Sequence, residues 1–258
     1  MTYKTIRVEE LYEGEVTEIT LNTPPANILS AKMMAEIKTQ LEIEQSKPHK
    51  KLIIFGGEGK HFCFGASVEE HQSGQVDDML PGFHDLIGKL VNCKIPTLAK
   101  VTGMSLGGGF EFVLACTFVF ADESAKFGVP EITLGVFPPV AAALLPFKCS
   151  DHFSSQMILT GDTFPVKELD RHGLINQVTE KGKLDEVVQS FFVEKIQPKS
   201  ASSLRIACQA SSMLMSDKYK EVIGRLESLY LKDLMSTKDA VEGINAFLEK
   251  RKPVWQDA

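Results

Sequence analysis

Near its middle, the chain reads LGGGFEFVLA at residues 106–115, and the tripeptide VPE follows at residues 129–131. The three consecutive glycines at residues 107–109 carry no Cβ atoms, so another molecule can approach their N–H groups closely. The apolar run over residues 110–115 predicts a buried helix. If the glycines begin this helix, its unpaired N–H groups lie where negative charge is favoured. The motif therefore predicts a backbone site for an anion or for an oxygen that gains negative charge.

Two glutamates accompany this backbone site. Glu111 would stand in the first turn of the helix, in apolar surroundings where desolvation raises a carboxyl pKa toward the range useful for proton transfer. Glu131 follows a proline between two apolar runs. Two acidic groups beside an anion-binding backbone indicate proton addition or removal next to a polarised carbonyl. Taken alone, the glycines could also serve tight packing, and Glu111 could merely complement the helix dipole.

A second glycine-containing loop reads GGEGKHFCFGAS at residues 56–67, directly after the apolar run 52–55, which is typical of a buried strand. An oxyanion hole needs two N–H donors that converge on one oxygen, and these commonly come from separate loops. The N–H groups of Ala66 and Gly108, 42 positions apart, are the candidates.

Together these motifs resemble the enoyl-CoA hydratase/isomerase (crotonase) family over nearly the whole chain. Further landmarks of the resemblance, in the same order as in the family, are LNTP at 21–24, GMSLGGGFE at 103–111, FGVPE at 127–131, GLI at 173–175 and FLEKRKP at 247–253. The resemblance implies an α/β chain with the crotonase (ClpP-like) fold, a spiral of ββα units flanked by helices. It implies a core at residues 1–195 with the CoA-binding and active site. Residues 196–258 would form a C-terminal helical oligomerisation region.

The resemblance also implies roles for individual residues. The N–H groups of Ala66 and Gly108 would form the oxyanion hole for a thioester carbonyl, while Glu111 and Glu131 would hold the added water as in hydratases. The residues expected to contact coenzyme A are Phe64, Ala66, Val68, Lys250, Arg251 and Lys252. The match does not decide which of the last three reaches the nucleotide phosphates.

Two segments depart from the family pattern. Ser67 replaces a common aspartate whose role is largely structural. Residues 135–145 read GVFPPVAAALL where many members carry a glycine-rich helix start. Pro139 has no N–H, so local contacts to substrate or water must differ there. This pattern resembles the cyclic dienoyl-CoA hydratases of anaerobic benzoyl-CoA degradation, which implies cyclohexa-1,5-diene-1-carbonyl-CoA as the substrate.

We expect the acyl pocket to include Phe137 and Pro138, which follow Glu131 at this departure. Phe83 and Leu86 are further candidates, because they have helical spacing, although plain core packing would explain that spacing equally well. The histidines His71 and His84 flank a polar stretch that could cover this pocket, but neither occupies a catalytic position of the family.

Composition limits the class of protein. The 258 residues suffice for one large domain or a core plus an appendage, and the net charge is −6 with dispersed basic residues, which argues against a nucleic-acid partner. Five cysteines, an odd number, suggest reduced thiols and a cytoplasmic location. Cys63 and Cys116 are expected to be small buried hydrophobes. No stretch approaches eighteen apolar residues, so no membrane span is expected, and no Cys/His spacing resembles a metal site.

The spacing of apolar residues predicts where strands and helices lie in the chain. Strands are predicted at residues 16–21, 52–55, 97–101 and 117–121, and Ser30 could cap a helix whose Met34, Ile37 and Leu41 share one face. Residues 217–234 have helical spacing, and Ser236 with Asp239 resembles a capping box for a last helix. The apolar faces of this tail need a partner. That partner is either a neighbouring subunit, as in the family's trimers and hexamers (dimers of trimers), or the same chain. Trp255 could anchor an interface or cap the core.

The sequence thus predicts a hydratase (a carbon–oxygen lyase) of an α,β-unsaturated acyl-CoA, without metal or redox cofactor, in which coenzyme A is part of the substrate. Glu111 would take a proton from the attacking water, and Glu131 would return a proton to carbon. Straight-chain enoyl-CoA hydration, double-bond isomerisation and thioester hydrolysis are the alternatives among enzymes. A non-catalytic acyl-CoA-binding scaffold is the alternative of another class. Retention of both glutamates favours the hydratase, since an isomerase needs one base.

Overall fold

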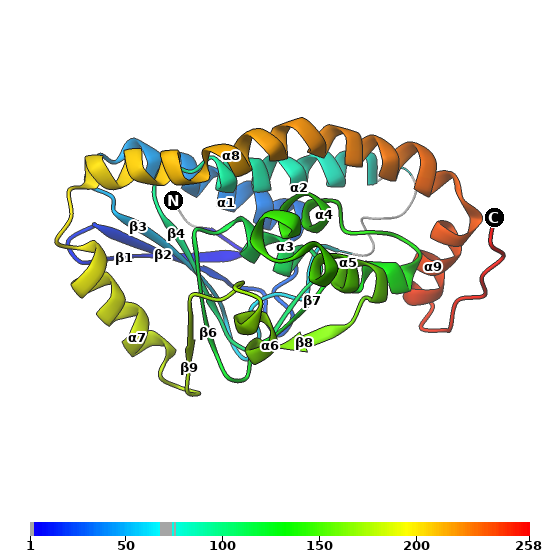
Figure 1. The fold of residues 1–258 in the computed structure, drawn as a ribbon, viewed down its shortest axis with the longest axis horizontal. Helices are drawn as coiled ribbons and strands as arrows, with labels where there is room; N and C mark the ends of the chain where they lie inside the picture. The colour runs from blue at the N-terminus through cyan, green and yellow to red at the C-terminus, as the bar shows by residue number, and fades with distance from the viewer. Residues whose placement is uncertain (1–2, 68–73, 75) are drawn as a thin grey trace.

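Two sheets form the centre of the protein (Figure 1), of which the computed structural model describes residues 3–67, 74 and 76–258. The larger sheet has the order β1 (Ile6–Leu11), β2 (Val16–Leu21), β3 (Leu52–Gly57), β4 (Thr97–Val101), β6 (Phe118–Asp122) and β9 (Gln177–Thr179). The pair β1–β2 is antiparallel, and all the other pairs of this sheet are parallel. The smaller sheet consists of β5 (Met104–Leu106), β7 (Lys126–Gly128) and β8 (Thr163–Pro165).

Helices surround these sheets. They are α1 (Ala31–Ser46), α2 (Val76–Val91), α3 (Gly108–Ala115), α4 (Pro139–Lys148), α5 (Asp151–Thr160), α6 (Val166–Arg171), α7 (Leu184–Phe191), α8 (Ala201–Ser228) and α9 (Lys238–Leu248), with the short helices η2 (Pro130–Leu134), η3 (Phe192–Ile196), η4 (Leu229–Asp233) and η5 (Leu234–Ser236). Figure 1 shows α8 running across one side of the molecule, and it packs against α2 and α4. Among the described residues, no helix combines the length and apolar character needed to cross a lipid bilayer.

Strand β3 has a continuously apolar sequence because both of its faces are buried. Successive side chains of a strand point to opposite faces of the sheet. Ile53 and Phe55 therefore pack into the main core, while Leu52 and Ile54 pack on the other face, against α7 and η3. A parallel strand that is buried on both faces needs no polar position.

The chain winds through the two sheets in repeated steps. From β4 it passes to β5 and into α3, and from β6 it passes to β7, η2 and α4. A bridge between Cys63 and Ser105 joins the loop after β3 to the smaller sheet, ahead of α2. Each step thus contains two extended segments followed by a helix, which is the expected ββα spiral of an α/β crotonase fold. The spiral places α3 and η2, which carry Glu111 and Glu131, in successive turns.

Most local predictions are confirmed, and two need correction. Ser30 accepts a hydrogen bond from the N–H of Met33 and caps α1 as expected. The strand predicted at 117–121 lies one residue later, as β6. The capping prediction at Ser236 was wrong, because Thr237 caps α9 and accepts from the N–H of Ala240 at 3.2 Å. Ser236 instead ends the turn before it and donates to a backbone carbonyl.

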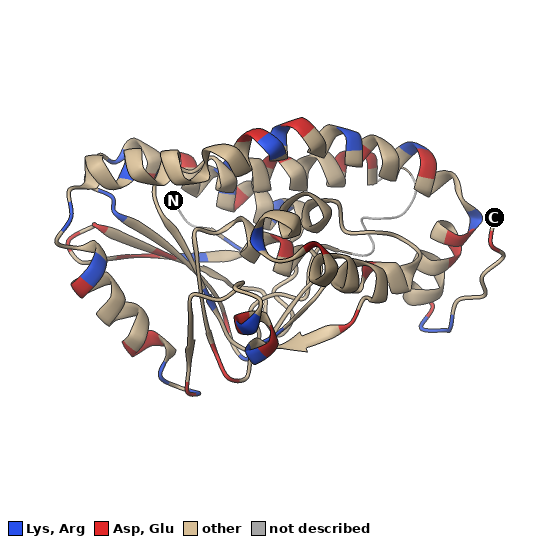
Figure 2. Ribbon diagram, viewed as in Figure 1, with Lys and Arg blue, Asp and Glu red and all other residues tan. Residues whose placement is uncertain are grey.

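The C-terminal helices pack on their own chain. Tyr219 of α8 donates its hydroxyl hydrogen to the carbonyl of His84 on α2 at 2.9 Å. The ring of Trp255 lies against Gly135 and Gly243, which leave room for it because they have no side chains. Of the two partners weighed for the tail, the structure therefore shows contacts with the same chain. Figure 2 shows Lys and Arg interspersed with Asp and Glu along the helices, as the sequence indicated.

Candidate active site

A cavity of about 80 Å³ lies between the successive turns of the spiral. The sequence-predicted site residues that it brings together are Phe64, Ala66, Phe83, Gly108, Glu111, Glu131, Phe137 and Pro138. Leu86 does not line this cavity and is fully buried in the core. Lys250, Arg251 and Lys252 do not line it either. Val68 and His71 lie outside the described residues.

Two backbone N–H groups meet at the edge of this cavity. Gly108 begins α3, and a Cβ atom built on it would lie 3.1 Å from the nitrogen of Ala66. Within the part of the chain that the structure describes, neither N–H has a hydrogen-bond partner. The first N–H groups of a helix have no partner inside it. Two adjacent unpaired donors can therefore hold one oxygen that carries negative charge.

Gly107 connects this donor pair to the acidic groups. Its backbone is left-handed, with φ of 50°, which a residue with a Cβ rarely adopts. A Cβ atom there would also lie 2.7 Å from Oε1 of Glu131. The first glycine of the run thus serves both the turn into α3 and the close approach of a carboxylate.

Glu111 is 3% exposed and holds the start of α4. Its Oε1 accepts a hydrogen bond from the N–H of Ala141 at 2.8 Å. Pro138, which caps α4, and Pro139, its first residue, have no N–H groups, so the first free donors of the helix are those of Val140 and Ala141. Burial raises the pKa of Glu111 to about 7, although these two N–H groups favour the charged form. A carboxyl group with this pKa can accept a proton near neutral pH.

Glu131 differs from Glu111 in its hydrogen bonding. Its Oε2 is buried without a hydrogen-bond partner among the described residues. Burial, and then the charge of Glu111, raise the pKa of Glu131 well above its ordinary value. Over the described chain, no Lys or Arg forms an ion pair with either glutamate. The two carboxyl groups therefore titrate as an interacting pair, and the pair holds a proton to a higher pH than an ordinary glutamate does.

Comparison with known proteins identifies the family to which a chain with this site is similar. The sequence pattern of the enoyl-CoA hydratase/isomerase family matches residues 12–258. The cyclohexa-1,5-dienecarbonyl-CoA hydratase of Thauera aromatica is 37% identical over 95% of this chain and 94% of its own length. A probable enoyl-CoA hydratase of Rhizobium meliloti is 34% identical over 98% of both chains. An enoyl-CoA hydratase crystal structure from Mycobacterium avium subsp. paratuberculosis has a TM-score of 0.87 at 24% identity, covering 99% of this chain and 100% of that one.

The chain belongs to the enoyl-CoA hydratase/isomerase family. The family, the crotonase fold and an enzyme of the enoyl-CoA hydratase type, all expected from the sequence, are thereby confirmed.

Sequence reasoning missed one polar residue of the cavity. Tyr230, in η4 of the C-terminal region, lines the cavity and is 1% exposed. Its ring centroid lies 5.5 Å from that of Phe137, in an edge-on arrangement. The helical spacing of residues 217–234 allowed either Leu229 or Tyr230 on the apolar face, and nothing in that spacing indicated which part of the fold this face would cover. Because Tyr230 lies in 196–258, residues 1–195 do not form the cavity alone.

The residues expected to contact coenzyme A lie in two places. Phe64 is 38% exposed at the cavity. Arg251 is engaged by two carboxylates, Glu242 and Glu249. Lys250 and Lys252 are exposed, and no ion pair to either occurs among the residues described. Within the C-terminal basic stretch, the two lysines are therefore the cations that remain available to an anionic ligand.

His84 and the cysteines lie outside the cavity lining. Nδ1 of His84 lies 2.7 Å from Glu227 of α8, so this histidine joins two helices. Burial raises the pKa of the Cys63 and Cys116 thiols to about 12 in both cases. Both thiols are fully buried and protonated, as expected for small hydrophobic residues.

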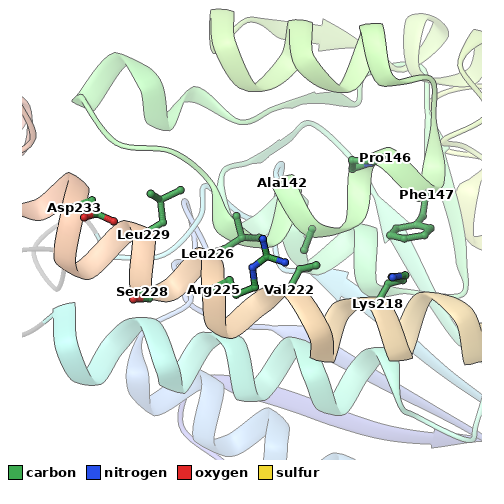
Figure 3. A pocket seen from close by; sticks show the side chains of 11 residues that line it. Ala142, Pro146, Phe147, Lys218, Val222, Arg225, Leu226, Ser228, Leu229 and Asp233 are labelled. Carbon is green, nitrogen blue, oxygen red and sulfur yellow. The ribbon is translucent and has the colours of Figure 1, made fainter.

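A larger hollow of about 660 Å³ lies between α4 and α8 (Figure 3). Its walls carry Phe147 of α4 and Lys218, Arg225 and Leu226 of α8. None of the glycines or glutamates of the family motifs lines it. The smaller cavity is therefore the candidate active site, because it alone of these two combines unpaired N–H donors with buried acids.

Proposed function

We propose that this protein adds water to an α,β-unsaturated acyl-CoA thioester, and that its substrate is the cyclic dienoyl thioester cyclohexa-1,5-diene-1-carbonyl-CoA. The observation that carries the proposal is the pair of buried carboxyl groups beside two N–H groups, where the described residues supply neither a cation for the acids nor a hydrogen-bond partner for the N–H groups. The similarity to the Thauera aromatica hydratase over 95% of the chain supports the cyclic substrate.

The geometry suggests a role for each group. The N–H groups of Ala66 and Gly108 would hold the thioester oxygen and stabilise the enolate character that develops as water adds. Glu111, with a pKa of about 7, would take a proton from the water that attacks the β-carbon. Glu131, whose pKa is raised by burial and by the charge of Glu111, would give a proton to carbon. In a conjugated cyclic diene, the carbon that receives it is the far end of the diene.

The start of α4 gives the cavity a wall that suits a flat ring. Pro138 and Pro139 fix the backbone at the start of α4, and Phe137 packs against Tyr230 beside them. Such a wall is preorganised and apolar, so a rigid ring loses little freedom on binding. A flexible alkyl chain would lose rotamer entropy against the same surface.

The test compares cyclohexa-1,5-diene-1-carbonyl-CoA with crotonyl-CoA on one preparation of enzyme, with products identified by mass spectrometry. We expect both thioesters to be hydrated and the cyclic one to have the higher kcat/KM. A clear preference for crotonyl-CoA would leave the hydratase and remove the cyclic substrate. If neither gains water, while deuterium from heavy water enters a substrate whose double bond moves, isomerisation would replace hydration.

The proposal includes the surroundings of the enzyme. The acyl-CoA would be the sole small-molecule partner, with no metal or redox cofactor, and the protein would be a cytoplasmic homotrimer or hexamer. Lys250 and Lys252 would contact the nucleotide phosphates, and Phe64 and Ala66 the adenine end of coenzyme A.

A further inference from the structure

Two unpaired polar atoms belong to the walls of one cavity. The hydroxyl of Tyr230 and Oε2 of Glu131 are both buried, and neither has a hydrogen-bond partner within the described chain. A buried polar group without a partner destabilises the folded protein, so its persistence calls for a functional explanation. They come from distant parts of the sequence, η4 and η2.

The surroundings of Tyr230 hold its ring in place. Phe137 packs against it edge-on, and the side chain sits in a π-helical turn, a rare geometry that is frequent at functional sites. Burial first, and then the charges of Glu131 and Glu111, raise the pKa of Tyr230 above its ordinary value. The phenol therefore keeps its hydrogen and acts in the cavity as a donor.

Glu111 has less capacity for water than a free carboxylate would have. One of its oxygens, Oε1, is occupied by the start of α4. A water molecule at this site needs a further partner to fix its orientation, and a bound water typically makes about three hydrogen bonds. Besides Glu131, Tyr230 is the buried side chain of the cavity lining that can donate a hydrogen bond and has no partner among the described residues.

We propose that Tyr230 is a further catalytic residue, which donates a hydrogen bond to the oxygen of the attacking water and, after the reaction, to the hydroxyl group of the product. This inference rests on the proposed hydratase function. In the hydration step, the water oxygen bonds to the β-carbon and one water proton moves to Glu111. The proton of Glu131 moves to carbon, and Tyr230 keeps its own hydrogen throughout.

The matched pair of variants is Tyr230→Phe and Tyr219→Phe. Both tyrosines are buried in the C-terminal region, but the hydroxyl of Tyr219 already bonds to the carbonyl of His84. We expect Tyr230→Phe to lower kcat about tenfold to a hundredfold with little change in KM, and to leave the urea midpoint unchanged or higher. Tyr219→Phe should do the reverse, with a lower urea midpoint and wild-type kcat.

A binding experiment tests the same contact without turnover. The ligands are two pairs of thioesters, each consisting of a hydroxyacyl-CoA and its analogue without the hydroxyl, one pair cyclic and one with four carbons. The wild type and Tyr219→Phe should prefer the hydroxyl-bearing member about tenfold, and Tyr230→Phe should lose that preference.

The two proposals fail in different ways. Absence of hydration by the wild type on any thioester would remove the proposed function, while the binding preference would still decide the role of Tyr230. Equal kcat and an equal hydroxyl preference in the wild type and Tyr230→Phe would overturn the inference. So would a wild type that shows no hydroxyl preference at all.

Discussion

Glu44 on α1 and Glu111 on α3 are both buried glutamates, but they differ in what surrounds them. Oε2 of Glu44 lies 3.1 Å from Nζ of Lys50, which is also fully buried, and accepts a hydrogen bond from Thr17 at 2.8 Å. Glu111 has the second buried acid, Glu131, as its neighbour and forms no ion pair with a cation in the described chain.

The two surroundings move the pKa in opposite directions. Burial alone would raise the pKa of Glu44, but hydrogen bonds from Lys47 and Thr17, together with the ion pair to Lys50, outweigh burial and lower it. At Glu111 burial prevails and the pKa rises to about 7. Burial is therefore no sign of function in itself. A carboxyl group that is buried beside a cavity without a cation has a raised pKa, and this raised pKa suits it to proton transfer near neutral pH.

The largest expected effect comes from breaking the buried ion pair between Glu44 and Lys50. Glu44→Gln leaves the ammonium of Lys50 buried, and the carboxylate that remains near it among the described residues is that of Glu10, at 3.8 Å. We expect the free energy of unfolding to fall by about 3–5 kcal/mol, measured by urea denaturation. The double variant Glu44→Gln, Lys50→Met should recover much of that loss, because neither position 44 nor position 50 then carries a charge. A single variant as stable as the wild type would contradict the paired structural role.

The second largest effect comes from replacing the two acids of the cavity, Glu111 and Glu131. Glu111→Gln and Glu131→Gln should each lower kcat about a hundredfold or more, while thioester binding and the fold persist. Glutamine keeps the size of the side chain, and at residue 111 its oxygen can still accept from the N–H of Ala141. Steady-state kinetics and calorimetry on the purified variants measure both quantities. Near-normal hydration by either variant would refute the paired-acid mechanism.

The comparison also shows what sequence reasoning could reach. The glycine run and both acids were predictable because contiguous motifs encode them, and strand β3 because residues 52–55 are continuously apolar. Tyr230 and the Lys50–Glu44 pair were not predictable, since periodicity indicates burial without naming the neighbour. Phe83 and Leu86 share one face of α2 but lie about 4.5 Å apart along its axis. That distance is enough for Phe83 to line the cavity while Leu86 packs in the core.

The pH dependence of stability should separate the two regions. The folded protein binds a proton at Glu111 more tightly than the unfolded chain does. Its contribution therefore lowers the free energy of unfolding as pH rises from about 4.5 through about 7. Glu44 behaves in the opposite way, because its lowered pKa stabilises the fold above the unfolded value and this stabilisation is lost in acid.

Glu111→Gln should consequently be more stable than the wild type at pH 8, by about 3 kcal/mol, and equal to it near pH 4. Urea denaturation across this range measures the difference. Glu44→Gln serves as the control, since its deficit should be largest at neutral pH and shrink in acid. A constant difference for Glu111→Gln at all pH values would show that the carboxyl group does not titrate in this window.

The smallest effect extends the contrast to the surface, where the C-terminal basic stretch also contains paired and unpaired charges. Arg251 donates to Glu242 at 2.8 Å and is engaged by Glu249 as well, whereas Lys250 and Lys252 have no ion pair among the residues described. Only a cation that is not already neutralised by a neighbour gains much from an added phosphate. The variant Lys250→Ala, Lys252→Ala should therefore raise KM for the acyl-CoA about twofold to fivefold, with kcat unchanged. The increase should shrink in high salt, because exposed charges are screened. Arg251→Ala is the matched control and should change KM less. A larger effect at Arg251 than at the two lysines would show that the ligand displaces the glutamates, and that pairing in the free protein does not predict which cation binds it.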